Sequence, residues 1–158
     1  MHPLVEQLLK QLSPRLSRVA IERARPELLP TMVRTDAAWQ AIMVEQGIPC
    51  PEALVDLGRA AENQLIHIDD DHGWDLLQPH EARETQRYLE RLAGEFPDLA
   101  PRSRMVPVFG EDGDLLLLAP DGRVWMFTHD AWESDEVVAE SFDQLIAAFI
   151  ERKRLTRF

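Results

Sequence analysis

Two apolar runs joined by a short turn constrain the fold of this chain more than any other feature. Residues 115–118 are four consecutive leucines, residues 124–127 read Val-Trp-Met-Phe, and Pro-Asp-Gly lies between them at 120–122. Proline presets φ and glycine permits positive φ, so this tripeptide predicts a turn between two strands. Strands that are apolar on both faces are typical of a sheet covered on both sides. We therefore expect a hairpin at the centre of a sheet, with helices packed on it.

Helical periodicity is found on either side of this hairpin. Apolar residues recur every three or four positions in several segments, which predicts helices at 4–12, 16–25, 38–46, 51–61, 79–94 and 142–150. Pro14, Pro26, Gly47 and Gly94 are placed to interrupt or end them, and Ser141-x-x-Gln144 is a capping box at the start of the last one. Further strand-like runs lie at 65–68 and 105–109.

Together these segments predict one domain over residues 1–158 of the α/β (α+β) class. We expect a central mixed or antiparallel sheet of about four to six strands, flanked by helices. The basic, weakly amphipathic segment at 1–26 is expected to be an N-terminal helical extension that caps the main body.

The charge of the chain restricts its partners. The formal net charge is −11 and the pI is about 4.8, so phosphate repulsion argues against binding nucleic acid. Such acidity favours encounter with a basic protein, or it serves only solubility. The single cysteine, Cys50, excludes an internal disulfide framework and a zinc–cysteine site. No apolar stretch is long enough for a membrane span, and Glu6 and Lys10 interrupt what would be a signal sequence, so we expect a cytoplasmic protein that does not bind membranes.

The C-terminal half carries a family pattern. The strand "MVPVFG", the segment "EDGDLLLLAPDGRVWMFTHD" and the helical "VVAESFDQLIAAFIE" follow one another. This order resembles the SUKH superfamily, which is related to fungal cell-wall assembly regulators. "GWDLLQPHEA" at 73–82 and "EQGIPCPEAL" at 45–54 are similar to earlier parts of the family pattern, so the resemblance covers residues 45–152. It implies an α/β fold with helices around a sheet. It also implies an immunity protein that neutralises a bacterial toxin, often a nuclease or deaminase, or a signalling adaptor, without a shared catalytic centre.

The first candidate site is an acidic stretch with two histidines, made of His67, Asp69, Asp70, Asp71 and His72. Carboxylates and imidazoles can hold a divalent ion. Successive side chains of an extended chain point in opposite directions, however, so the five cannot all converge. The alternative is a solvated acidic loop that meets a basic partner.

The second candidate follows the last apolar strand. Trp132 lies among acidic residues, which suits an interface where the ring is an anchor and the carboxylates pair with Lys or Arg. The alternative is that Trp132 folds back onto the sheet. Trp74, beside Asp75, presents the same two possibilities, with burial favoured because the helix after it must dock. The pair His129-Asp130 has only Ser134 as a nearby nucleophile, and no Gly-x-Ser-x-Gly elbow is present.

These observations predict a non-enzymatic protein-binding domain without a metal or cofactor, an immunity protein that occludes the basic active-site region of a cognate toxin. The residues expected to contact the partner are Asp69, Asp70, Asp71, Trp74, Asp130, Trp132, Glu133, Asp135 and Glu136. An intracellular adaptor of the same fold and a metal-dependent hydrolase using His67 and His72 remain alternatives.

Overall fold

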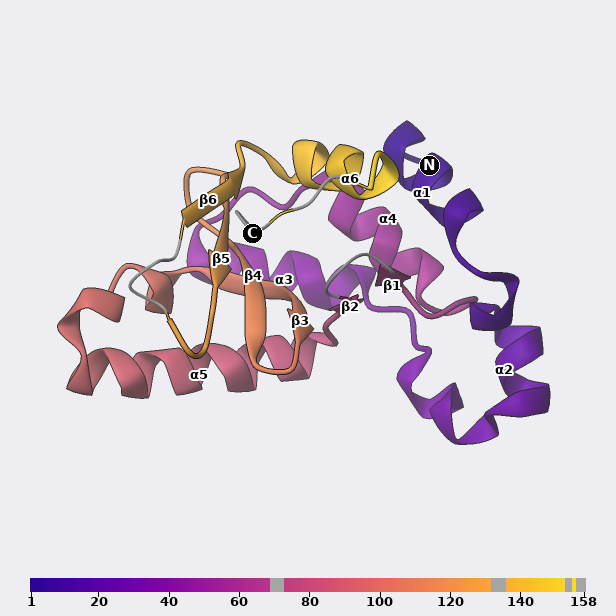
Figure 1. The fold of residues 1–158 in the computed structure, drawn as a ribbon, viewed down its shortest axis with the longest axis horizontal. Helices are drawn as coiled ribbons and strands as arrows, with labels where there is room; N and C mark the ends of the chain where they lie inside the picture. The colour runs from indigo at the N-terminus through magenta and orange to yellow at the C-terminus, as the bar shows by residue number, and fades with distance from the viewer. Residues whose placement is uncertain (69–72, 132–135, 153–154, 156–158) are drawn as a thin grey trace.

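The computed structural model describes residues 1–68, 73–131, 136–152 and 155, and its centre is a six-stranded antiparallel sheet (Figure 1). Each strand pairs with the next one in the chain, so the order β1-β2-β3-β4-β5-β6 is a simple meander. The strands are β1 His67–Ile68, β2 Trp74–Leu76, β3 Val106–Glu111, β4 Asp114–Leu118, β5 Val124–Phe127 and β6 Glu136–Ala139. The expected α+β class and the expected flanking helices are confirmed, and the sheet is antiparallel throughout.

The helices lie close to where the periodicity predicts them. Their bounds are α1 Pro3–Gln11, α2 Arg18–Ala24, α3 Asp36–Gln46, α4 Glu52–Ala60, α5 Pro79–Glu95 and α6 Phe142–Ile150, with short 3-10 turns at Pro14–Leu16, Pro26–Thr31, Pro97–Leu99 and Arg102–Arg104. Gly47 ends α3 as expected, whereas α5 continues past Gly94 and ends just before Phe96-Pro97. In the described ranges no helix is both long and apolar enough to cross a bilayer.

Both faces of the sheet are buried, as the double-sided apolar runs predict. Alternate residues of β4 point to opposite sides, so Leu116 and Leu118 join a large core with residues of α1, α3, α4 and α6. Leu115 and Leu117 join a second core with Leu89 of α5. Figure 1 shows α5 along one side of the sheet and α1, α4 and α6 on the other. Because helices occupy both faces, solvent reaches the sheet at the ends of its strands and along the half-buried edge strand β6.

The expected N-terminal extension divides into two parts. Helix α1 belongs to the main core, because Val5 and Leu8 are buried there and His2 joins Asp56 of α4 and Asp143 of α6. Helix α2 and the 3-10 turn after it instead form a projecting lobe, residues 13–34, on the side of the molecule away from β6 (Figure 1). Arg18 holds this lobe to the body: its side chain donates to the backbone oxygens of Met32 and Glu62 at 3.2 and 2.9 Å.

Candidate functional site: the acidic end of the sheet

The meander brings three connections of the chain to one end of the sheet. In an antiparallel meander, successive connections alternate between the two ends, so those after β1, β3 and β5 share an end. The register agrees, since Asp75 pairs with Gly110, and Leu115 pairs with both Gly110 and Phe127. We call this region the acidic end and define it by the described residues His67, Gly73, Asp75, Glu111, Asp112, Gly113, Asp114, His129, Asp130 and Glu136.

His129 joins the second and third of these connections. Its Nδ1 lies 2.7 Å from Asp114 Oδ1, its Nε2 lies 3.1 Å from Asp130 Oδ1, and its backbone N–H donates to Asp114 Oδ1 at 3.2 Å. The hydrogen bond to Asp114 raises the pKa of His129 above its usual value, with Coulomb attraction to Asp130 adding to the effect. A protonated imidazole can donate to both carboxylates at once, so this geometry suits the imidazolium form.

Gly113 makes room for this imidazole. Asp112 and Gly113 form the tight β3–β4 turn, with φ of 46° and 91°, which is the Asp-Gly pattern that a two-residue hairpin favours. A methyl group on Gly113 would stand 3.1 Å from both Cγ and Nδ1 of His129. The turn sequence and the position of the histidine therefore depend on each other.

The first connection lies beside the second at Gly73. His67 Nδ1 lies 2.6 Å from Asp75 Oδ1 across the β1–β2 pair. A methyl group on Gly73 would lie 3.3 Å from His67 Cε1 and 3.7 Å from Glu111 Oε1. The three connections are thus neighbours rather than separate loops.

His129 is not arranged as a general base. Both its ring nitrogens are occupied by carboxylates, whereas a general base needs one of them free to accept a proton. Cys50 lies outside the acidic end, between α3 and α4, and burial raises the pKa of its thiol, which disfavours the nucleophilic thiolate. Among residues 1–68, 73–131, 136–152 and 155 no three His, Cys, Asp or Glu side chains could hold a metal ion together. His72, the second imidazole of the hydrolase alternative, lies outside those ranges.

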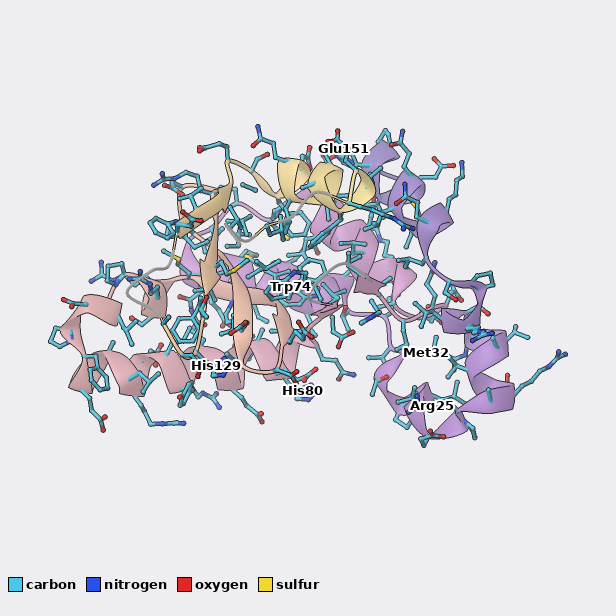
Figure 2. All side chains as sticks on the ribbon, in the orientation of Figure 1. Arg25, Met32, Trp74, His80, His129 and Glu151 are labelled. Atoms are coloured by element: carbon cyan, nitrogen blue, oxygen red, sulfur yellow. The ribbon has the colours of Figure 1, made fainter. Side chains whose placement is uncertain are left out.

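A groove of about 620 Å³ opens beside the acidic end. One wall is the lobe and the chain before β1, the other is the first half of α5, and the β3–β4 turn closes one end. In Figure 2 the labelled residues Met32 and His80 mark the lobe and α5 at its two sides. Its lining includes the carboxylates of Asp75, Glu81, Glu111, Asp112 and Asp114, and no Lys or Arg among the described residues.

Several carboxylates elsewhere on the molecule are paired with guanidinium groups. Asp36 lies 3.2 Å from Arg34 and 3.0 Å from Arg59, and hydrogen bonds from both lower its pKa to about 2. Glu45 has Arg83 at 2.6 Å. Residues 105–151 contain eleven Asp and Glu but a single Lys or Arg, Arg123. At the acidic end, Asp75, Asp114 and Asp130 each lie within 3.1 Å of an imidazole nitrogen of His67 or His129.

The opposite end of the sheet has a different character. The ring of Trp125 has the guanidinium groups of Arg102 and Arg123 at 5.9 and 5.8 Å from its centroid. A shallower hollow of about 530 Å³ lies beside it, and its lining includes Arg104 as well as Arg123. Arginines therefore gather at the end of the sheet opposite the acidic end, where Asp121 lies 2.8 Å from Arg123.

The structure places the predicted contact residues unevenly. Asp130 is highly exposed, with 81% of its side-chain surface accessible, and Glu136 begins β6 at the same end. The prediction that Trp74 contacts a partner is wrong. Its side chain is 1% exposed and lies in the main core, which is the alternative that the docking of the following helix favoured, so it cannot anchor a partner. Figure 2 shows Trp74 in the interior and His129 at the sheet end. The remaining predicted contacts lie outside the described residues: Asp69, Asp70, Asp71, Trp132, Glu133 and Asp135.

Sequence reasoning missed the middle of the acidic end. Glu111, Asp112 and Asp114 are not among the predicted contacts, and the sequence pattern groups His67 with its acidic neighbours rather than with Asp75. The available signal was the density of charge, three carboxylates in four residues of a two-residue hairpin. A comparison of the chain with protein-family models, with curated proteins and with solved structures gives no match.

Proposed function

We propose that this chain is a protein-binding domain whose acidic end contacts a positively charged protein partner. In its specific form, the proposal is an immunity protein that neutralises a cognate bacterial toxin by covering the basic region around the toxin's active site. The domain works by occlusion and needs no chemistry, metal or cofactor of its own. A toxin that handles nucleic acid suits this mechanism, because carboxylates can take the place of substrate phosphates.

The observation that carries this proposal is the gathering of three acidic connections at one end of a sheet whose faces are buried. Charges gathered in one patch attract an oppositely charged partner over a distance of about a Debye length, ~10 Å at 0.1 M salt. Such a patch accelerates association more than it strengthens the final complex. The resemblance to the SUKH superfamily supports the toxin as partner.

The first test identifies the partner and measures its rate of association. The tagged chain is used to capture a partner from its native cells, and association of the purified pair is followed from low to high salt. We expect the association rate to fall steeply as salt rises, because screening removes the long-range attraction. An association rate that is independent of salt would contradict the electrostatic mechanism.

Matched charge variants locate the attraction. Asp112→Asn and Asp130→Asn each remove one negative charge from the acidic end, and asparagine accepts the positive φ of position 112. Glu90→Gln removes the same charge from the exposed face of α5 and serves as the control. The two variants at the acidic end should slow association severalfold at low salt, and the control should not.

Co-expression with the captured partner distinguishes an immunity protein from an adaptor. Rescue of growth indicates an immunity protein, and a partner that is harmless by itself indicates an adaptor.

A further inference from the structure

We infer that the groove beside the acidic end receives a short extended segment of the partner, in which Lys or Arg alternates with apolar side chains. This inference rests on the proposed function and adds the part of the partner that is recognised. The acidic end attracts any basic protein, whereas a groove with a shaped lining can select a particular segment.

The size of the groove fits a short segment. Its volume of about 620 Å³ lies in the range of pockets that hold a single compact ligand, roughly 300–1,000 Å³. A folded domain cannot enter such a space, but a few residues of extended chain can. Gln78 Nε2 donates to the Thr31 backbone oxygen at 3.1 Å and so links the two walls of the groove. This hydrogen bond fixes the position of α5 relative to the lobe before a ligand binds.

The lining of the groove offers apolar contact that the fold itself does not use. Val33 and Tyr88 lie on opposite walls with 44% and 47% of their surface exposed. Between them, Leu65, Leu76 and Leu77 are only half-buried. Covering these side chains removes apolar surface from water, which stabilises a complex by about 25 cal/mol per Å². An apolar side chain of the segment would supply that cover.

The carboxylates of the groove keep acceptors for a cation. Asp75 uses Oδ1 for His67, and Glu81 uses Oε1 for the backbone N–H of Gln78. In the described part of the chain their second oxygens accept no hydrogen bond, and Asp112 takes part in no ion pair. A guanidinium or ammonium group placed among them would meet several acceptors at once. In a segment of alternating apolar and cationic side chains, the apolar ones can cover the leucines at the floor of the groove. The cationic ones can then reach the carboxylates at its rim.

The test uses synthetic peptides and two valine variants with identical charge. The probe is a capped hexapeptide of alternating leucine and arginine. A peptide of alternating serine and arginine has the same charge without apolar contact, and one of alternating leucine and glutamate has the opposite charge. Val33→Lys places a cation in the groove, and Val44→Lys makes the same substitution at a position that is 80% exposed on α3 outside the groove. Dissociation constants are measured by titration calorimetry, with thermal melting to verify that each variant is folded.

We expect the leucine–arginine peptide to bind the wild-type chain at least tenfold more tightly than either control peptide. Val33→Lys should weaken that binding tenfold or more, and Val44→Lys by less than about twofold, since the two variants change the net charge equally. As a measurement that needs no variant, amide shifts of the isotope-labelled wild-type chain should change most at Val33, Leu77 and Thr85.

Other outcomes overturn the inference. Equal weakening by the two valine variants would mean attraction by net charge alone. Equal binding of the serine–arginine peptide would mean that the apolar floor has no role, and absence of binding or shifts confined to other surfaces would exclude the groove. If the captured partner still associates with a steep salt dependence while Val33→Lys leaves that complex intact, the groove inference fails and the proposed function stands. If association is independent of salt, the proposed function fails whatever the peptides do.

Discussion

Gly113 and Gly122 offer a controlled perturbation of the acidic end. Both lie in tight hairpin turns at positive φ, 91° and 88°. An added methyl group meets nothing within 4 Å at Gly122, but at Gly113 it meets the His129 ring at 3.1 Å. Gly113→Ala and Gly122→Ala therefore impose the same backbone cost, and only the first disturbs the imidazole.

The backbone cost can be worked out from the conformation. A left-handed backbone costs an L-residue roughly 1–2 kcal/mol, and the smaller entropy of the unfolded alanine chain offsets about 0.4–1 kcal/mol. Gly122→Ala should then lower the free energy of unfolding by about 0–1.6 kcal/mol. For a chain of this length, each kcal/mol corresponds to a Tm change of about 2–4 °C. Gly113→Ala should lose more than this, because the His129 ring must also move away from Asp114.

Two measurements separate these contributions. Urea unfolding followed by circular dichroism gives the stability of the two variants, and NMR titration of the imidazole protons gives the pKa of His129. We expect the pKa of His129 to fall toward its usual value in Gly113→Ala and to stay raised in Gly122→Ala. Equal stabilities together with an unchanged pKa of His129 in both variants would refute the idea that Gly113 positions this ring.

Three further perturbations test the site and its support. Asp114→Asn removes the carboxylate that contributes most to the raised pKa of His129, so NMR titration should show that pKa falling. Because the pKa of His129 is raised in the folded state, its interaction with Asp114 stabilises the wild type fully below the unfolded pKa of about 6.5, and this stabilisation is lost as pH rises through the folded pKa. Between these two pKa values, the free energy of unfolding in urea should fall less with pH in Asp114→Asn than in the wild type. Gln86→Leu leaves the buried Met105 carbonyl without its 3.1 Å donor and should cost about 1–3 kcal/mol in urea unfolding. Ser141→Ala removes the acceptor that caps α6 at Gln144 N and should lower the stability by ~1 kcal/mol in the same assay.

The sequence predicts the strongly patterned elements of this fold and misses the weakly patterned ones. The hairpin at 115–127 was recognisable because both its strands are apolar on both faces, and they pair as β4 and β5. Strands β2 and β6 are Trp-Asp-Leu and Glu-Val-Val-Ala, and neither is the continuous apolar run of four residues that marked β5. Their pairing comes from neighbouring strands rather than from their own composition.

Some helix ends were predictable from the local sequence and others were not. Gly47 has the left-handed conformation that ends α3, which is a local property and was predictable. Gly94 has helical geometry instead, and α5 ends one residue later, where the Pro97 ring disfavours a helical conformation at Phe96. At α6 the Ser141 side chain caps Gln144 N as expected, but the Gln144 side chain accepts from the Glu140 N–H rather than from Ser141.

The composition of the acidic end could not be predicted from the sequence, because its residues are brought together only by the order of the strands. His67 and His129 are far apart in the sequence, and nothing near either residue indicates that both lie at one end of a sheet. Their common end follows from the number of strands between them, because connections separated by an even number of strands emerge at the same end of a meander. Recognising the short strand β2 was therefore necessary to place His67 and Asp75 at the same end as the turn at 111–114.

The placement of the connections at one end of the sheet also explains why so many carboxylates are compatible with a stable fold. A sheet buried on both faces has little room for charge in the middle of its strands, and carboxylates of the acidic end such as Glu111, Asp114 and Glu136 lie at strand ends. Placing several carboxylates at one end raises their mutual repulsion, which the imidazole of His129 and the adjacent solvent reduce. Self-repulsion of this kind lowers stability, and a basic partner relieves it, so the electrostatic strain of the free chain contributes to the affinity of the complex. It follows that Asp112→Asn, which leaves both carboxylate partners of His129 in place, should leave the free chain as stable as the wild type or more stable; if it instead destabilises the chain, the acidic end has a structural role and the argument for a binding surface fails.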